Sequence, residues 1–131
     1  MVDVKLNAPA PYKLNDWAQY NALLSFDLPT LIEKMKQSLS WVHGELNAKI
    51  LVESPYKQIL LTALHEGTEI ESFQAYDSIT IQVIEGRLNF HSKNKSVTLE
   101  KSQLLALHEK IEYSLTCAEE TVFLLTIIKT Q

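Results

Sequence analysis

Two stretches of the chain share a pattern: Ala63-Leu64-His65-Glu66-Gly67-Thr68 and Val83-Ile84-Glu85-Gly86-Arg87-Leu88. The glycine of the second stretch stands nineteen positions after the glycine of the first. In both stretches a run of apolar residues ends near a glycine. Glycine readily adopts the positive φ angles and the close backbone approaches that tight turns between strands need. We therefore predict that Gly67 and Gly86 each mark a turn at the end of a strand.

An alternation of apolar and polar residues extends this prediction to most of the chain. Beyond Trp41 the apolar residues recur with a period of two, and turn material such as Glu53-Ser54-Pro55 separates the runs. Short strands at roughly ten-residue spacing are typical of a sandwich or barrel rather than of alternating strands and helices. We predict strands over 48–52, 58–64, 78–85, 88–91, 96–99, 104–107, 113–117 and 122–128.

The N-terminal third has a helical pattern. Asp27 is a good N-cap, and Pro29 is tolerated in a first turn. Apolar residues then recur at three- and four-residue steps, which predicts a helix over 28–39. We expect the apolar stripe of this helix to pack on a sheet. An extended arm is expected over 1–14, and the pattern allows a short helix over 15–24. We divide the chain into an N-terminal arm and helix, 1–40, and a barrel domain, 41–131.

Length, charge and cysteine content narrow the classes of function. The chain has 131 residues, the size of one domain, and a net charge of -4 without a basic, aromatic-rich run, so we expect no nucleic-acid partner. Its longest apolar runs, 59–64 and 122–128, are far shorter than the about 20 residues of a membrane helix. Cys117 is the single cysteine, and the stretch after Met1 lacks a signal-peptide pattern. We expect a cytoplasmic protein that does not bind membranes.

The spacing of later runs makes the pattern more specific. Together with the two turn glycines, the apolar runs at 104–107 and 122–127 give a sequence that resembles the small single-domain cupins over about residues 41–129. The resemblance implies an all-β fold with a short N-terminal helical lead-in, built as a cupin-type double-stranded β-helix (jelly-roll) barrel. It also implies the family's metal site of three histidines and a glutamate.

Other residues stand at the family's metal-binding positions. Counted from the turn glycines, the first two histidine positions fall on Phe73 and Ala75, and the glutamate position falls on Ile79. In the second motif the histidine position falls on Tyr113, and the usual Gly-Asp pair is Ser102-Gln103. A divalent metal in such a site needs imidazole and carboxylate ligands, which none of these residues supplies. We therefore expect no metal and no other cofactor.

The period of two also predicts which side chains line the barrel. If Ile79 points inward, Ile81 and Val83 do so as well, and Gln82 faces the other way. The same argument extends from Tyr113 along its strand. The predicted ligand-binding lumen consists of Phe73, Ala75, Ile79, Ile81, Val83, Tyr113, Leu115 and Cys117.

Several polar residues have both a functional and a structural interpretation. Tyr113 could orient or protonate a ligand, but a core tyrosine bonded to a backbone carbonyl is more common. Cys117 could be a reactive thiol, although its apolar, cation-poor surroundings favour a small buried hydrophobe. His65 and His108 could meet at one mouth of the barrel as an acid–base or metal pair, yet turn histidines are usually solvated. Arg87 could clamp an anion or be a surface charge.

Three functions from different classes remain open. We rank first a non-catalytic barrel that binds a small, mostly apolar ligand as a sensor or carrier. An interaction or scaffold protein with a filled barrel comes second, and a metal-free, isomerase-type enzyme using Tyr113 and a histidine comes third. Under all three we expect a homodimer with residues 1–25 in the contact. The resemblance implies such pairing, and Trp17 and Tyr20 need a surface to pack against.

Overall fold

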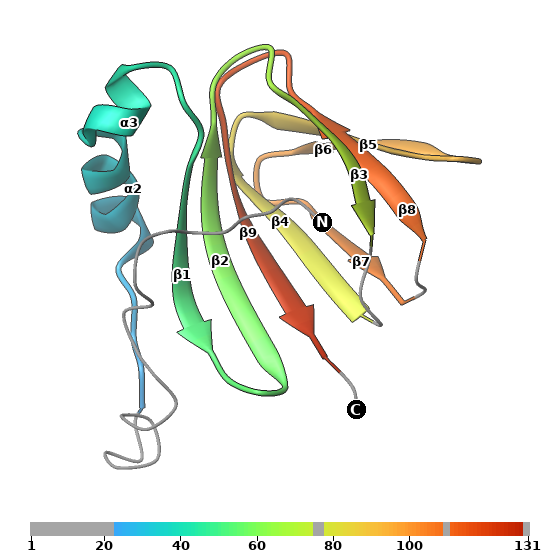
Figure 1. Ribbon diagram of the computed structural model, residues 1–131, viewed down its shortest axis with the longest axis horizontal. Coiled ribbons are helices and arrows are strands. Elements are labelled where there is room, and N and C mark those ends of the chain that lie inside the picture. Colours follow the sequence, from blue (N-terminus) through green and yellow to red (C-terminus); the bar gives the residue numbers. More distant parts are fainter. Residues whose placement is uncertain (1–22, 75–77, 109–110, 130–131) are drawn as a thin grey trace.

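The computed structural model describes residues 23–74, 78–108 and 111–129, shown as a ribbon in Figure 1. Two short helices, α2 (Leu28–Lys36) and α3 (Leu39–Val42), precede the strands. The described strands are β1 (Asn47–Glu53), β2 (Lys57–Leu64), β3 (Glu69–Gln74), β4 (Ser78–Glu85), β5 (Arg87–Ser92), β6 (Ser96–Glu100), β7 (Leu104–Leu107), β8 (Glu112–Thr116) and β9 (Thr121–Ile128). The expected all-β fold with a helical lead-in is confirmed.

The strands form two antiparallel sheets that face each other. The larger sheet has the order β1-β2-β9-β4-β7, and the smaller has the order β3-β8-β5-β6. Four short connections cross between the sheets, from β2 to β3, β4 to β5, β6 to β7 and β8 to β9. This arrangement is the jelly-roll topology expected of two packed sheets that close toward a barrel.

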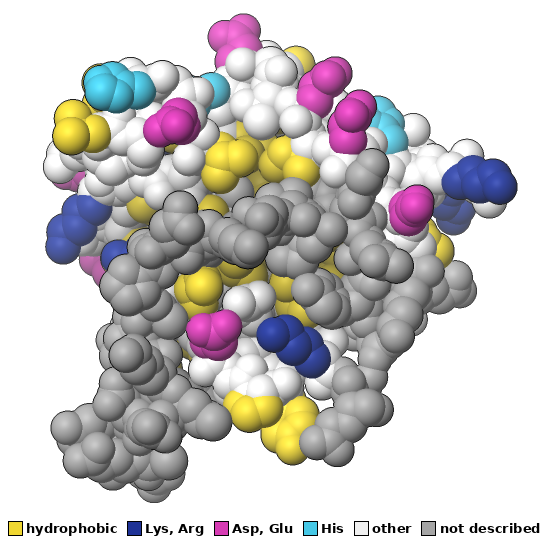
Figure 2. All heavy atoms as spheres, in the orientation of Figure 1, with side chains coloured by type: hydrophobic (Ala, Val, Ile, Leu, Met, Phe, Trp, Pro, Cys, Tyr) yellow, Lys and Arg dark blue, Asp and Glu magenta, His cyan; other side chains and the backbone are white. Residues whose placement is uncertain are grey.

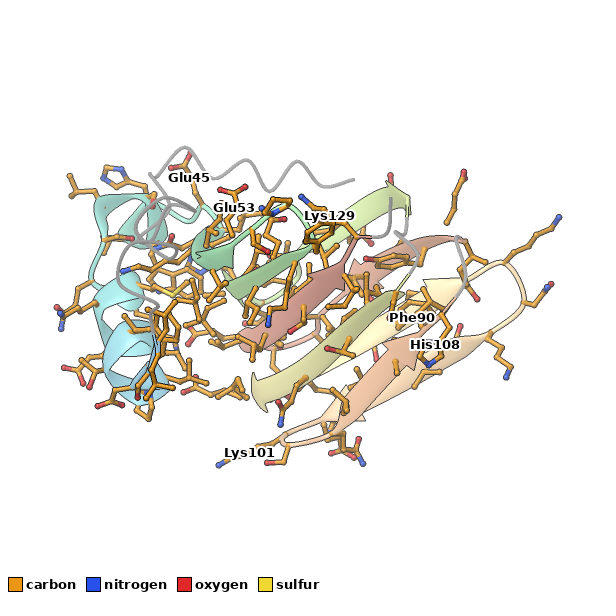
Figure 3. The ribbon with its side chains drawn as sticks, turned by 90° about the horizontal axis from the view of Figure 1, so that it is seen from below. Glu45, Glu53, Phe90, Lys101, His108 and Lys129 are labelled. Carbon is orange, nitrogen blue, oxygen red and sulfur yellow. The ribbon has the colours of Figure 1, made fainter. Side chains whose placement is uncertain are left out.

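The main core lies between the two sheets. On β4, Ile81 and Val83 are fully buried whereas Gln82 between them is exposed, so the predicted alternation holds on this strand. Phe90 lies within the barrel (Figure 3). We call these side chains the inner cluster: Ile50, Leu60, Leu64, Ile70, Ile79, Ile81, Val83, Leu88, Phe90, Leu99, Tyr113, Leu115, Cys117, Phe123, Leu125 and Ile127.

A second apolar cluster joins the helices to the outer face of the larger sheet. Asp27 caps α2 by accepting a hydrogen bond from the backbone N–H of Thr30 at 3.4 Å. The apolar stripe of α2 and the following Trp41 then pack outside β1, β2 and β9. The buried members are Ile32, Met35, Trp41, Leu51, Val52, Leu61, Ala63 and Val122.

Lys36 fastens the C-terminal end of α2 to two turns of the barrel. Its Nζ lies 2.8 Å from Glu85 Oε1 and 2.7 Å from Glu120 Oε2. Partial burial lowers the pKa of Lys36, but the hydrogen bonds to Glu120 and Glu85 outweigh this effect, so the pKa is raised above its ordinary 10.5. The lysine therefore stays charged at neutral pH and holds the helix against the sheet.

The turn glycines have the backbone geometry expected of them. Gly67 has a φ of 84° and Gly86 a φ of 86°, both in the left-handed region. At Gly86 an added Cβ would also collide with the carbonyl oxygen of Glu120 and lie 2.6 Å from Thr121 Oγ1. A close approach between the β4–β5 and β8–β9 turns therefore requires glycine at position 86.

Two expectations about secondary structure need correction. The helix expected over 28–39 is interrupted, because Ser38 leaves the helical conformation and its hydroxyl caps α3 through the backbone N–H of Trp41. The strand β3 was not expected. Glu69 and Glu71 alternate with the buried Ile70, but the irregular register between Ile70 and Phe73 breaks this alternation after three residues. The expectations for residues 1–22 and for Ala75 lie outside the described residues.

Candidate functional site

Two of the four positions that hold metal in cupins lie side by side across neighbouring strands. Phe73 on β3 and Tyr113 on β8 are direct backbone partners in the smaller sheet. Ile79 on β4 belongs to the same inner cluster as Tyr113 and is 1% exposed. The spacing of the motif therefore brings these positions to one region of the barrel, although the residue types have changed.

The residues at this place do not fit a metal ion. Ile79 offers no lone pair, and Tyr113 stacks on the ring of Phe90 with centroids 5.1 Å apart. Tyr113 is 5% exposed and lies in an apolar environment. In the part of the chain that the structure describes, no group of three or more His, Cys, Asp or Glu side chains could hold a metal. Ile79 and Tyr113 do not supply the imidazole and carboxylate ligands that a divalent metal needs at such a site.

The described members of the predicted lumen all lie in the inner cluster. Ile81 and Val83 are 0% exposed, and Leu115 is 1% exposed. Phe73 is described only in its backbone, which pairs with that of Tyr113. The burial of these residues agrees with an inward orientation, while their role in binding a ligand stays a prediction.

Cys117 is a buried thiol at the end of β8. Its Sγ donates a hydrogen bond to the carbonyl oxygen of His65 at 3.2 Å. Burial raises the pKa of the Cys117 thiol above its ordinary 9.0, and the neighbouring hydrogen bonds do not offset this effect. The thiol therefore stays protonated at neutral pH, which favours the structural interpretation over a reactive nucleophile.

His65 has a structural partner. Its imidazole stacks on the indole of Trp41 with centroids 3.5 Å apart and an interplanar angle of 18°. Its Nε2 donates a hydrogen bond to the carbonyl oxygen of Trp41 at 2.9 Å. The side chain thus ties the end of β2 to α3.

His65 and His108 do not meet, so the less favoured of the two interpretations of these histidines does not hold. His65 follows the end of β2 that pairs with the start of β9 at Thr121. His108 follows Leu107, the last residue of β7. Leu107 and Ile127 both pair with Ile79 on β4, so they lie at the same level of the larger sheet. Six residues of an antiparallel strand, at about 3.4 Å each, separate these levels by about 20 Å. The two histidines lie at opposite ends of the larger sheet and cannot form an acid–base pair.

Other candidate polar residues lie on the surface. Arg87 is half exposed and pairs with Glu100 at 3.3 Å, which agrees with a surface charge. His91 lies 3.1 Å from Ser96 Oγ and 3.2 Å from Thr116 Oγ1 on the outer face of the smaller sheet. The sequence reasoning did not single out this hydrogen-bonded histidine, whose signal was its place in a polar run on the outer side of β5.

A cavity lies beside the barrel where β8 begins. It has a volume of about 430 Å³ and is bounded by the β5–β6 turn and by the residues that lead into β8. We call it the mouth cavity, defined by Ser92, Lys93, Asn94, Ile111 and Glu112. Ser92 is the backbone partner of Tyr113, so this cavity adjoins the strand position of the changed histidine. It combines one apolar side chain, two charges of opposite sign and two neutral polar groups.

A smaller hollow of about 260 Å³ lies on the other side of the larger sheet. Ser25, Phe26 and Asp27 lead into α2 there, beside Lys49 and Leu51 of β1. It is separated from the barrel interior by the larger sheet. None of the helices in the described part of the chain is long and apolar enough to cross a membrane.

Comparisons with known proteins identify the fold. No family model and no curated protein matches the sequence. A conserved protein of unknown function from Streptococcus pyogenes has a similar structure, with a TM-score of 0.65 and 15% identity over 84% of this chain and 90% of that chain. A cupin superfamily protein from Desulfitobacterium hafniense aligns with a TM-score of 0.63 and 12% identity over 66% of this chain and 79% of that one.

A larger enzyme contains a similar unit. The salicylate 1,2-dioxygenase of Pseudaminobacter salicylatoxidans aligns with a TM-score of 0.67 and 16% identity over 77% of this chain but only 33% of the enzyme. At such identities the likeness concerns the fold alone. The protein is a small single domain with the cupin fold, and the resemblance drawn from its turn glycines is confirmed at that level.

Proposed function

We propose that the protein is a non-catalytic binding module that takes a small molecule with an apolar body at one mouth of its barrel. The observation that carries this proposal is the mouth cavity of about 430 Å³ beside Tyr113. Binding pockets for small molecules commonly measure about 300–1,000 Å³ and combine apolar walls with a few polar groups. Here Ile111 supplies an apolar wall, and Lys93, Asn94 and Glu112 supply polar groups at the rim.

The predicted lumen begins next to this cavity, because Ser92, which lines the cavity, is the backbone partner of Tyr113. Ile79, Tyr113 and Leu115 make that lumen apolar and aromatic, with one phenol, and are almost fully buried. An apolar lumen disfavours a charged ligand, because a buried charge without a partner costs several kcal/mol or more. A catalytic role is disfavoured because none of the residues predicted to line the lumen is a carboxylate or an imidazole that could act as a base.

A fragment titration followed by NMR tests this proposal. A set of small aromatic and aliphatic alcohols, amines and carboxylates is added to the full ¹⁵N-labelled chain. The amide shifts caused by the best fragment are expected to cluster at Ser92, Asn94 and Ile111. Ile111→Gln, at a half-exposed position, should weaken that fragment at least about tenfold, the equivalent of 1.4 kcal/mol.

Thr98→Gln is the matched control, because Thr98 is exposed on the outer face of β6. It should leave the fragment's affinity unchanged. Shifts confined to the hollow around Phe26 and Leu31, or no shifts with any fragment, would refute the mouth as a binding site.

A scaffold protein with a filled barrel is the second candidate. It is favoured by the 0% exposure of Ile81, Val83 and Leu88, which leaves no water-sized space against these side chains. The homodimer expected from the sequence suits both candidates and remains a prediction. Light scattering coupled to gel filtration should give about twice the 14.9 kDa chain mass.

A further inference from the structure

Two hollows adjoin where β5 ends and β8 begins. The first is the mouth cavity. The second is an open depression of about 250 Å³, lined by His91, Ser92, Lys93, Glu112, Tyr113 and Ser114. The two hollows share Ser92, Lys93 and Glu112. Phe90 and Tyr113 point into the inner cluster, so the neighbouring His91 and Ser114 point to the outer face of the smaller sheet. The site therefore extends from the barrel mouth onto that outer face.

The residues shared by the two hollows carry one charge of each sign. Ser92 on β5 pairs with Tyr113 on β8, so the next position of this antiparallel register brings Lys93 level with Glu112. Both side chains are exposed. Figure 2 shows Lys or Arg side chains at the tip of the β5–β6 hairpin, at the right, with an Asp or Glu side chain beside them. The rim of the mouth cavity thus holds a positive and a negative group close to each other.

These two charges do not neutralise each other in the structure. Within residues 23–74, 78–108 and 111–129, no ion pair or side-chain hydrogen bond involves Lys93 or Glu112, whereas Lys36 and Arg87 have carboxylate partners. An ion pair between two exposed side chains would contribute little to stability. A ligand that engages both groups therefore gives up little by keeping them apart.

The two charges favour one charge pattern in the ligand. Lys93 attracts an anion that Glu112 repels, and Glu112 attracts a cation that Lys93 repels. An uncharged molecule gains from neither side chain. A molecule with one group of each sign gains from both, because its carboxylate can lie toward Lys93 and its ammonium group toward Glu112.

The apolar part of the site lies next to the negative charge. Ile111 is half buried and lines the mouth cavity directly before Glu112. A ligand whose two charges stand at one end keeps them at the exposed rim and covers Ile111 with its apolar end, so no charge has to be buried. An α-amino acid with an apolar side chain has this arrangement of groups.

We propose that the mouth cavity binds a small zwitterion of the apolar α-amino acid class. This inference rests on the proposed binding function and adds the class of ligand. Lys93 binds the carboxylate, Glu112 binds the ammonium group, and Ile111 contacts the apolar side chain.

A matched series of compounds titrated into the full ¹⁵N-labelled chain tests this class. Phenylalanine, N-acetylphenylalanine, phenylalaninamide and N-acetylphenylalaninamide share one apolar body but carry both charges, the negative one, the positive one or none. At about pH 6 the amino and carboxyl groups of these compounds are ionised. Phenylalanine should bind at least about threefold more tightly than each singly charged compound, the effect of one exposed ion pair. About 0.5 M salt should remove this preference, because salt screens exposed charges.

Two substitutions test the charges separately. In Lys93→Gln, phenylalanine should bind no better than phenylalaninamide but still better than N-acetylphenylalanine. In Glu112→Gln, it should bind no better than N-acetylphenylalanine but still better than phenylalaninamide. Lys95→Gln is the matched control, because Lys95 is exposed in the same turn and lines neither hollow. This control should preserve both preferences.

The outcomes separate the class of ligand from the binding function. Equal affinities of the four compounds at the mouth would overturn the zwitterion and leave the binding function intact. A loss of preference in Lys95→Gln as large as in Lys93→Gln would also overturn it, because the effect would then be one of general charge. Mouth shifts with other fragments but with none of these four would refute the class alone, and no mouth shifts at all would refute both. Preferences that Lys93→Gln and Glu112→Gln remove one at a time support the proposal.

Discussion

The imidazole of His65 lies flat against the indole of Trp41, with ring centroids 3.5 Å apart, and donates a hydrogen bond to the carbonyl oxygen of the same tryptophan. One side chain therefore makes both a stacking contact and a polar contact to α3. Trp41 is 7% exposed and belongs to the cluster that joins the helices to the sheet. His65 therefore connects the end of β2 to the helices that cover the larger sheet.

Replacing His65 should loosen this attachment. His65→Ala removes the stacked ring and one of the two hydrogen bonds that the Trp41 carbonyl accepts, the other coming from the backbone N–H of Gly44. This loss should lower the free energy of unfolding by about 1–2 kcal/mol. His43→Ala is the control, because His43 is exposed beside α3. Urea titrations of both variants measure the difference. Equal effects of the two substitutions would contradict the fastening role.

The turn at Gly86 should be far less tolerant than the turn at Gly67. Both glycines have a positive φ, so alanine at either should cost about 1–2 kcal/mol in backbone strain. Gly86→Ala must in addition separate the turn from Glu120 and Thr121, whereas a Cβ at Gly67 meets no atom within 4 Å. We expect Gly86→Ala to cost at least about 2 kcal/mol more than Gly67→Ala in thermal or urea unfolding. Similar losses would mean that the two turns move apart readily.

Ser102 carries strain that glycine would relieve. Its backbone φ is 71°, a value that residues other than glycine rarely adopt. It also stands at a position where the cupin motif has a glycine. Ser102→Gly should therefore raise the free energy of unfolding by about 0.5–1 kcal/mol, the strain relieved less the entropy that glycine adds to the unfolded chain. A higher urea midpoint with an unchanged slope would show this. A lower midpoint would mean that the Ser102 side chain stabilises its turn.

The backbone framework was more predictable from the sequence than the site. Gly67 and Gly86 predict sharp turns because few other residues adopt a positive φ. The spacing between these glycines predicts where the neighbouring strands begin and end. The alternation over β4 identified Ile81 and Val83 as buried for the same kind of local reason. By contrast, the strand β3 was not predicted, because an irregular register interrupts its period of two.

Contacts between segments that are distant in the chain could not be predicted from the sequence. His65 and His108 both follow apolar runs, and nothing local indicates that the two runs end at opposite ends of the larger sheet, measured along its strands. The partnership of His65 with Trp41 joins residues 24 positions apart through the packing of α3, which no periodicity encodes. The mouth cavity likewise depends on how the β5–β6 turn sits against β8.

The buried thiol should make stability depend on alkaline pH. The folded pKa of Cys117 lies above 9.0, so the thiol ionises more readily in the unfolded chain. Its contribution is complete below pH 9.0 and is lost as pH rises toward the folded pKa. Cys117→Ala should therefore lose less stability than the unmodified chain between about pH 8 and about pH 10. Urea unfolding at several pH values measures both slopes, and parallel slopes would contradict the raised pKa.

The orientation of β4 can be tested with two neighbouring substitutions. Ile81 is fully buried in the inner cluster, so Ile81→Lys places a charge among apolar side chains. Burying an unpaired charge should cost at least about 4 kcal/mol, a large part of the 5–15 kcal/mol that stabilises a small domain. Gln82→Lys, one residue along on the exposed face, should change stability by no more than about 0.5 kcal/mol.

Thermal melts of these two variants decide between the faces of the strand. Successive residues of a strand point to opposite faces, so an error of one position would exchange the two outcomes. Failure of Gln82→Lys to fold would refute the inward placement of Ile81, and the apolar lumen built on it would fall as well. A folded Gln82→Lys beside an unfolded Ile81→Lys would leave the lumen apolar and closed to charge. Any ligand at the mouth would then have to present an uncharged body to the interior.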